Sequence, residues 1–244
     1  DTPSTQQLTS TLPTGELHFD TNEHQRINRW KFHLGQEHSL AGGWGLNYGV
    51  RYSLTNDHSW QTFLPTGSNT AASPTNSYSR QNEDIVNVYA GTDGKIGEKL
   101  DFEVSLAAEY YHSPAWHQWN VYPTLSLTYM PNSGHMLLLN VSSDKRFPDY
   151  WTLQNFTSFS NGGYNEVVGN PSLKPSSNYQ TQLVYVLHNK YQFVAWFNYT
   201  DDYFTQTPYQ RHDRLTVQYK FLNFDYSQQW GLQASVPQRF GNWL

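Results

Sequence analysis

Six side chains in the connecting segments are the residues of this sequence best suited to contact a ligand. They are Trp116, Trp119, Arg146, Tyr150, Trp151 and Tyr203. Aromatic rings offer flat faces for sugars or peptides, and a guanidinium adds a cation with several hydrogen-bond donors. Residues 146–151 have the strongest claim, because they combine a cation, a carboxylate and three aromatic rings. The competing interpretation for aromatic residues near strand ends is an aromatic girdle at a membrane interface.

No set of residues predicts a catalytic or metal centre. Glu103 and Glu109 lie on one face of an expected strand, about 20 Å apart at roughly 3.3 Å per residue, whereas glycosidase carboxylates lie roughly 5 to 9.5 Å apart. We expect both to line a polar face together with Arg29, Lys31 and Arg51, where charge pairs can form between neighbouring strands. The 10 histidines are scattered, and the chain has no cysteine, so no convergent ligand set is visible.

Sequence motifs and net charge exclude further classes of function. No nucleophile elbow and no phosphate-binding glycine loop occurs. The net charge of -5 disfavours nucleic acid as a partner. The sequence therefore predicts a protein that is not an enzyme and has no cofactor.

Apolar and polar residues alternate along most of the chain, which is the pattern of β-strands with one apolar face. The clearest case is a hairpin of residues 180–187 and 191–200, in which Leu183, Tyr185 and Leu187 share a face. The same pattern predicts strands at residues 28–34, 46–54, 84–92, 100–111, 121–130 and 135–141. Each apolar face needs a dry environment, either a packed core or lipid.

Composition favours lipid over a packed core. The chain has 244 residues, of which 16% are aromatic and only 14% charged, whereas roughly 25% are charged in soluble domains. A mean hydropathy of -0.72 excludes a helical membrane protein. It is compatible with a membrane β-barrel, whose lumen and loops are polar.

The connections alternate in length, as they do in outer-membrane barrels with short periplasmic turns and long extracellular loops. Short connections are expected at residues 35–43, 93–99, 131–134 and 188–190, and the longest loops at residues 55–81 and 142–178. The last segment, residues 214–236, reads as one long strand whose apolar phase slips at a bulge near residues 223–228. The total of about nine strands is odd, whereas bacterial barrels have even numbers. We therefore expect residues 1–244 to be a single partial barrel domain without its neighbouring strands.

Five segments, taken in order, carry a resemblance to a known family. They are residues 49–55, 122–129, 143–151, 169–175 and 198–204. Together they resemble the barrel domain of the outer-membrane β-barrel family of TonB-dependent receptors and transporters, of the Bacteroidetes type. The resemblance covers residues 22–243. Within it, residues 169–175 combine two prolines with a glycine, and we interpret them as an anchor that pins a long loop to the next strand.

The resemblance implies an all-β, antiparallel transmembrane barrel of about 22 strands in the outer membrane of a Gram-negative bacterium. It implies import of a bulky nutrient, such as a glycan, a peptide or a metal chelate, through a plugged lumen. Neither the plug nor an energy-coupling box is visible in this sequence. The implied partners are the plug domain, the missing strands, a TonB-type inner-membrane energy complex, a surface lipoprotein and outer-membrane lipid.

Two alternative functions remain open at this point. One is a secreted β-sandwich that binds glycans through Trp116, Trp119 and Trp151. The other is a passive porin, which would differ by having no plug.

Overall fold

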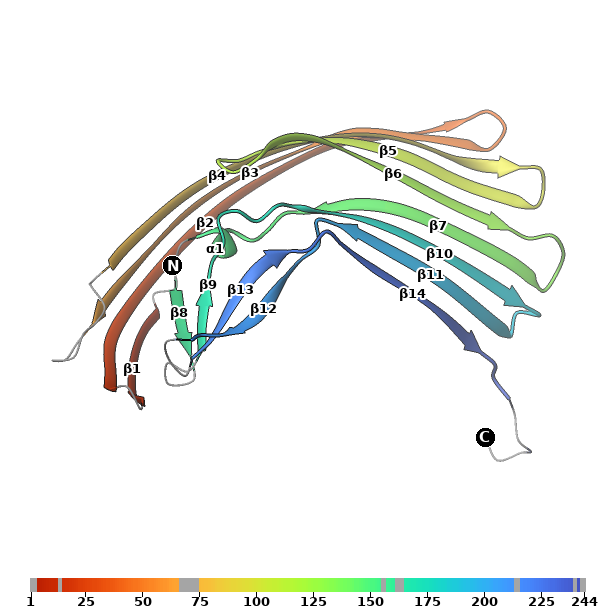
Figure 1. The fold of residues 1–244 in the computed structure, drawn as a ribbon. Helices are drawn as coiled ribbons and strands as arrows, with labels where there is room; N and C mark the ends of the chain where they lie inside the picture. The colour runs from red at the N-terminus through yellow and green to blue at the C-terminus, as the bar shows by residue number, and fades with distance from the viewer. Residues whose placement is uncertain are drawn as a thin grey trace.

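The computed structural model describes residues 4–12, 15–65, 75–154, 157–160, 165–212, 216–238 and 241. Ten of its strands form one sheet, which we call the wall. Their bounds are β1 Ser4–Leu12, β2 Gly15–Leu40, β3 Trp44–Pro65, β4 Thr75–Ile96, β5 Leu100–His112, β6 His117–Tyr129, β7 His135–Arg146, β10 Ser176–Leu187, β11 Tyr191–Asp201 and β14 Tyr226–Ser235. They are neighbours in the order β1-β2-β3-β4-β5-β6-β7-β10-β11-β14, and the sheet is open, with β1 and β14 at its edges. The wall curves into an arch (Figure 1).

A smaller sheet lies on the concave side of the wall, under the arch (Figure 1). We call it the inner sheet; its strands are β8 Thr157–Ser160, β9 Asn165–Val168, β12 Phe204–Gln210 and β13 Val217–Asn223. Their order is β12-β13-β9-β8, with β13 and β9 parallel. The one-turn helix α1, Tyr150–Leu153, precedes them in the chain. The inner sheet is therefore built from the two long connections that follow β7 and β11.

The expected single strand over residues 214–236 is wrong. Its described part consists of β13 and β14, which belong to different sheets; residues 214 and 215 lie outside the described residues. The chain leaves one sheet at Asn223, passes Phe224 and Asp225, and joins the wall at Tyr226. The change in apolar phase therefore marks a change of sheet and not a bulge. The other eight expected strands are confirmed as β2 to β7, β10 and β11.

The wall keeps its apolar and polar faces in register from strand to strand. Tyr52 on β3 pairs with Phe32 on β2 and Val86 on β4, and Val86 pairs with Tyr110 on β5. Large apolar side chains at such positions are exposed, among them Trp30, Phe32, Leu34, Val88, Leu106, Val121, Phe193, Trp230 and Leu232. Residues of the opposite parity face the inner sheet. The sequence alternation thus produces one apolar convex face and one largely polar concave face.

The height of the apolar face matches the hydrocarbon layer of a membrane. On β5 the convex positions run from Leu100 to Tyr110 without a charged residue. Ten residue steps span about 33 Å, or about 25 Å when the strand is tilted by about 40°, which is the height of the apolar band in outer-membrane barrels. The β-sandwich alternative is wrong, because the smaller sheet lies on the concave, polar side of the wall (Figure 1) and the apolar residues of the convex face are exposed.

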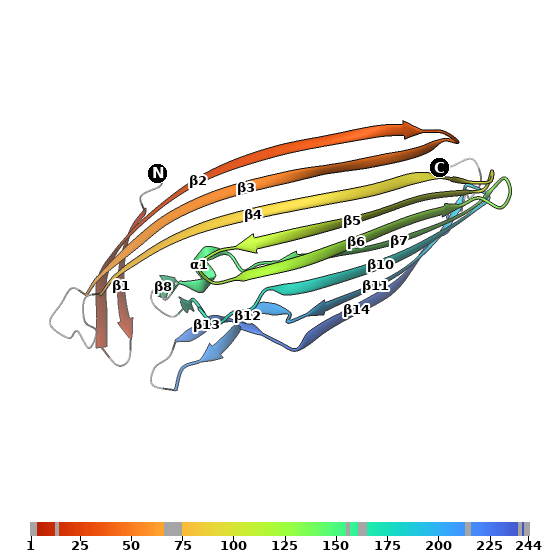
Figure 2. The ribbon, with the colours of Figure 1, turned by 90° about the horizontal axis from the view of Figure 1, so that it is seen from above.

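Short turns close one end of the wall, and the other end carries the long connections after β7 and β11 together with the short connection 113–116 (Figure 2). The turns occupy residues 41–43, 97–99, 130–134 and 188–190, and Gly42 and Gly43 supply positive φ angles of 81° and 78° in the first. Strands β2 to β4 continue well past the apolar band, so most of the loop expected at residues 55–81 is ordered sheet. None of the described helical residues forms a segment long and apolar enough to cross a membrane.

Candidate functional site

The segment after β7, residues 147–154, folds onto the concave face of the wall at its long-connection end. Helix α1 starts after Asp149, whose carbonyl accepts hydrogen bonds from the backbone N–H of Thr152 at 2.9 Å and from its hydroxyl at 2.6 Å. Beyond the helix, Gln154 Nε2 donates to Ser59 Oγ at 3.2 Å. This bond joins the segment to a strand 95 residues earlier in the sequence.

A row of buried polar side chains on β3 lies beneath this segment. Thr55, Asp57 and Ser59 alternate along the strand, and each is at most 5% exposed. Ser59 Oγ donates to the Asp57 carboxylate at 3.2 Å, and Gln25 Nε2 on β2 donates to Asp57 Oδ2, also at 3.2 Å. Buried polar groups are stable only with such partners. The row is therefore a built polar layer between the wall and the segment that covers it.

Glu83 on β4 is a second centre of this layer. Its buried carboxylate accepts hydrogen bonds from the Tyr111 hydroxyl and, at 3.3 Å, from Thr55 Oγ1. Arg29 Nε in turn donates to Thr55 Oγ1 at 3.1 Å. Burial and the neighbouring Glu83 carboxylate raise the pKa of Tyr150 above its ordinary value. Tyr150 consequently stays protonated, as an uncharged phenol inside a polar layer.

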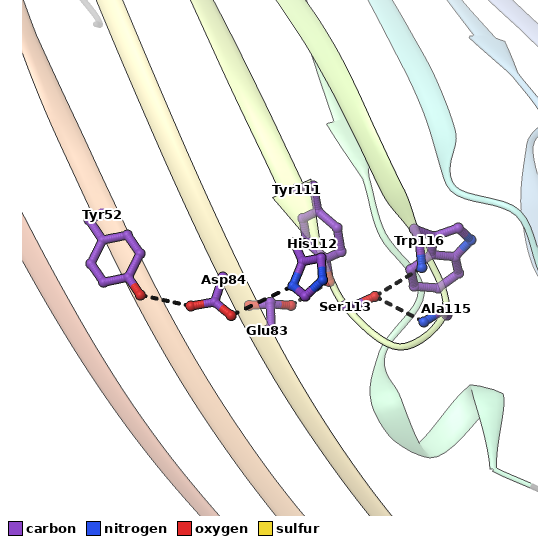
Figure 3. Close-up of polar contacts among 8 residues, drawn as sticks. All are labelled: Tyr52, Glu83, Asp84, Tyr111, His112, Ser113, Ala115 and Trp116. Atoms are coloured by element: carbon purple, nitrogen blue, oxygen red, sulfur yellow. Dashed lines mark hydrogen bonds and ion pairs between the residues drawn. The ribbon is translucent and has the colours of Figure 1, made fainter.

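Trp116 is fixed by both its backbone and its ring. The Ser113 hydroxyl accepts hydrogen bonds from the backbone N–H groups of Ala115 at 3.3 Å and Trp116 at 3.1 Å (Figure 3). The Trp116 ring lies 5.7 Å from the Phe147 ring, which stacks on Tyr111 at 3.6 Å. The structure therefore gives Trp116 a packing role between the β5–β6 connection and the segment that follows β7.

A small apolar core holds the inner sheet and α1 together. Leu153, Leu173 and Phe204 are buried, and Trp116 packs against them. Arg146 lies over the Phe204 ring, with its guanidinium carbon 4.8 Å from the ring centre. Each fully buried side chain of this size contributes about 1.5 to 3 kcal/mol. These contacts stabilise the long connections as one packed unit.

Residues 169–175 link the parts of this unit. Asn170 donates its backbone N–H to the Thr152 carbonyl at 2.6 Å and its Nδ2 to the Phe221 carbonyl at 2.9 Å. The backbone N–H of Lys174 donates to Asn223 Oδ1 at 2.8 Å. The segment thus joins α1 to β13 immediately before β10 begins, which is the anchoring role expected from its prolines and glycine.

Trp151 and Tyr203 are two predicted ligand residues of the long connections that follow the wall strands β7 and β11, and both side chains stay partly exposed. The Trp151 ring meets Phe221 edge to face at 5.3 Å, and the side chain remains 48% exposed. Tyr203 is half-buried at the corner between β11 and β12, where its carbonyl accepts the N–H of Phe224 at 2.7 Å. We call the long connections after β7 and β11 the inward-folded unit; among its described side chains, Trp151 has the most exposed aromatic ring.

Trp119 does not join the other predicted ligand residues. It lies on β6 in the register of Tyr110, with the two rings 5.1 Å apart, and it is 65% exposed on the convex face. Its position at the upper border of the apolar band is that of a girdle residue. The expectation that Trp119 acts with Trp116 and Trp151 is wrong, because alternation along β6 turns its ring to the outside.

Of the charged residues expected on the concave face, Arg51 and Glu109 have polar or aromatic partners there, as Arg29 has in Thr55. Arg51 lies over the Tyr89 ring at 4.8 Å, and His33 Nε2 is 3.0 Å from the Tyr89 hydroxyl. Glu109 accepts hydrogen bonds from Tyr122 at 2.9 Å and Asn87 at 3.3 Å. Within the described ranges, no ion pair joins the expected residues to one another, and no three His, Asp or Glu side chains converge as metal ligands.

Sequence reasoning missed the buried polar groups. Thr55, Asp57 and Ser59 have the same parity as Arg51, so a strand continued through them would place them on the concave face. The polar composition of the segment instead resembled that of a loop. Glu166 on β9 had no comparable signal. It is 1% exposed and receives hydrogen bonds from Arg211 at 3.2 Å and Gln218 at 3.3 Å, both distant in sequence.

Comparison with known proteins gives one family match and several structural ones. The model of the family described as "Outer membrane protein beta-barrel family" matches residues 1–244. A comparison with curated proteins found no match. Several solved structures also match, but their sequence identity is so low that the matches show a similar fold and nothing more.

Three of these structures are receptors or transporters. The siderophore receptor PirA of Pseudomonas aeruginosa is 10% identical with a TM-score of 0.52, and the match covers 90% of this chain and 49% of that one. The hemophore receptor HasR of Serratia marcescens, solved with its hemophore HasA and heme, is 12% identical with a TM-score of 0.55, over 90% and 42% of the two chains. The FrpB iron transporter of Neisseria meningitidis is 14% identical with a TM-score of 0.52, over 97% and 41%. This chain therefore spans less than half the length of each.

Proposed function

The chain belongs to the outer membrane protein beta-barrel family, and on that premise we propose that it forms part of the wall of a plugged, TonB-dependent receptor that imports a bulky nutrient. The observation that carries the proposal is the arrangement of the wall. Its convex face is apolar over the height of a bilayer, its concave face is polar, and two long connections fold inward as a packed unit. A wall of this kind encloses a polar conduit and narrows it at one end.

In this proposal the inward-folded unit contacts a nutrient at the entrance to the conduit. Trp151 supplies an exposed ring, Tyr203 a half-buried one, and Arg146 a guanidinium held over Phe204. Trp116 holds the unit on the wall through its contacts with Phe147 and with Tyr111 of β5. Flat rings and a guanidinium suit glycans, peptides and anionic metal chelates alike, so the substrate class is a matter for experiment.

The proposed partners follow from the same architecture. A plug domain would occupy the lumen against the polar concave face, and further strands would continue the wall from its edges β1 and β14. A TonB-type inner-membrane complex would supply the energy, and a surface lipoprotein would cooperate at the long-connection end.

The test is a growth assay in the native bacterium with the whole protein. A deletion strain and its complemented parent are grown on a panel of single nutrients that includes glycans, peptides and ferric chelates. We expect the deletion to abolish growth on one nutrient class, and removal of the TonB-type protein to abolish growth on the same class. Growth that depends on this protein but not on the energy complex would favour a passive porin and contradict the proposal.

A further inference from the structure

The convex face changes character just beyond the apolar band on β2, β3 and β4. Three cross-strand rows follow one another there: Asn28, Asn56 and Asn82; then Arg26, His58 and Arg80; then His24, Trp60 and Tyr78. All nine residues have the parity of Leu54 and Trp30, so they continue the lipid-facing surface outward. Polar amides, then cations, then aromatic rings therefore succeed the apolar residues along these strands.

The cationic row lies at the depth of lipid head groups. His58 is four residues beyond Leu54 on β3, which corresponds to about 13 Å along the strand and about 10 Å along the membrane normal at a tilt of about 40°. The polar region of each leaflet extends about 5 to 8 Å beyond the hydrocarbon in an ordinary bilayer, and further for a lipid with a sugar head group. At about 10 Å, the two arginines lie beyond the acyl chains and just outside the head groups of an ordinary bilayer, at the level of a head group that carries sugars.

The arginines of the cationic row form no ion pair with any carboxylate in the described part of the chain. Arg26 and Arg80 are both exposed, and no described carboxylate forms an ion pair with either. The outward-facing Asp84 is engaged elsewhere, by the Tyr52 hydroxyl at 2.7 Å and by His112 at 3.7 Å (Figure 3). Two cations on either side of one histidine repel each other unless an anion lies between them.

The aromatic row adds a flat surface beside the cations. His24 stacks on Trp60 with ring centres 5.7 Å apart, and His58 Nδ1 is 3.4 Å from the Tyr78 hydroxyl. Trp60 and Tyr78 are 36% and 69% exposed. Amphipathic rings next to a cationic row suit a ligand with a sugar ring attached to a phosphate.

We propose that Arg26, His58 and Arg80 bind a phosphate group of a phosphorylated glycolipid in the outer leaflet, whose sugar lies on Trp60 and Tyr78. The arginines provide bidentate, charge-assisted hydrogen bonds to the phosphate. Continuity with the apolar band selects a lipid over a soluble ligand, because the acyl chains then lie directly on Trp30 and its apolar neighbours. The site would fix the long strands β2 to β4 at a defined depth.

The test uses the whole protein purified from outer membranes and lipid A, a diphosphorylated glycolipid, as the probe in native mass spectrometry. The variant is the double substitution Arg26→Gln and Arg80→Gln. The matched control is Lys99→Gln with Lys190→Gln, which removes two exposed cations at the opposite end of the wall. We expect the variant to bind lipid A at least about tenfold more weakly, and the control to bind as the wild type does. Dephosphorylated lipid A should bind wild type and variant equally.

Three results would overturn the proposal. They are unchanged lipid A binding in the arginine variant, equal binding of phosphorylated and dephosphorylated lipid by the wild type, and displacement of the lipid by an equal concentration of inorganic phosphate. The heat-induced shift on detergent gels shows whether each variant is folded. The variant with Arg26→Lys and Arg80→Lys provides a second measurement: it keeps both charges but loses the bidentate geometry, so it should bind lipid A more weakly than the wild type and more tightly than the glutamine variant.

Discussion

A charge placed on the convex face of β5 should destabilise the protein much more than the same charge on its concave face. Val104 lies near the middle of the apolar run from Leu100 to Tyr110, and it is 43% exposed on the lipid side. Glu103, its neighbour in the chain, is exposed on the concave face. The substitutions Val104→Arg and Glu103→Arg therefore introduce one side chain at nearly the same depth but on opposite faces.

The expected magnitude follows from the depth. Arginine on the lipid face near the bilayer midplane costs about 2 to 4 kcal/mol, which is a factor of about 30 to 900 in the folding equilibrium. Arginine in place of Glu103 faces water and Asp93, its register partner on β4, so we expect a change within about 0.5 kcal/mol.

The assay is guanidinium unfolding of the whole protein in phosphatidylcholine vesicles, followed by tryptophan fluorescence. The free energy of unfolding is compared for wild type, Val104→Arg and Glu103→Arg. Equal losses in the two variants, or a larger loss for Glu103→Arg, would refute the assignment of the two faces.

Three further predictions concern the inward-folded unit and the polar layer of the wall beneath it. In Gly169→Ala the new Cβ would overlap the carbonyl oxygen of Gln154, so the connection after β7 should lose its packing, and limited proteolysis should cut it much faster than in the wild type. Tyr111→Phe removes a hydrogen-bond donor from the buried Glu83 carboxylate and should lower the free energy of unfolding by about 1 to 3 kcal/mol, measured by the same guanidinium titration. In the double variant Tyr111→Phe with Glu83→Gln, the uncharged side chain should restore part of this free energy. Trp151→Ala removes a partly exposed ring and should reduce nutrient uptake at least fivefold, an estimate of about 1 kcal/mol or more from stacking energies. Loss of its contact with Phe221 should lower the unfolding free energy by about 0.5 to 1.5 kcal/mol, and uptake equal to wild type would exclude this ring from the ligand site.

The sequence predicted the wall well because alternation has a direct physical cause. In residues 100–110, the convex positions are all apolar or aromatic and the concave ones are acidic, Ser or Ala, so the period of two is visible without any tertiary information. In residues 191–200, the convex positions are likewise Tyr, Phe or Ala, although Val194 and Trp196 occupy concave ones. The tight turns were also visible, since glycine, proline and asparagine meet local backbone requirements that do not depend on the rest of the fold.

The inner sheet could not be predicted in the same way. Strands β8 and β9 have four residues each, too few for a periodic signal, and β13 pairs in parallel with β9, about 50 residues earlier. Long-range contacts such as Arg211 with Glu166 have no local sequence signature. Composition also misled at residues 55–61, because a strand beyond the lipid band is polar on both faces and resembles a loop.

The candidate site was predicted in part for the same reasons. Residue type indicated aromatic rings and Arg146, whereas their orientation depended on strand phase and tertiary packing. Trp119 follows the phase of β6 to the outside, and Trp116 is drawn into the core by Phe147. If the apolar alternation of the expected strand had been continued to its end, the sequence alone would have assigned Trp116 and Trp119 to opposite faces of the sheet.

The most direct test of the central claim, that the wall separates lipid from a polar conduit, is a nitroxide scan along β5. The chain contains no cysteine, so single cysteines at residues 102–109 of the whole protein give one label each in this region after reconstitution into vesicles. Collision rates with oxygen report lipid, and those with a water-soluble nickel complex report the aqueous side. The account predicts oxygen maxima at Phe102, Val104, Leu106 and Ala108, with nickel maxima at the intervening residues. Uniform exposure to either reagent, or maxima of the opposite phase, would contradict it.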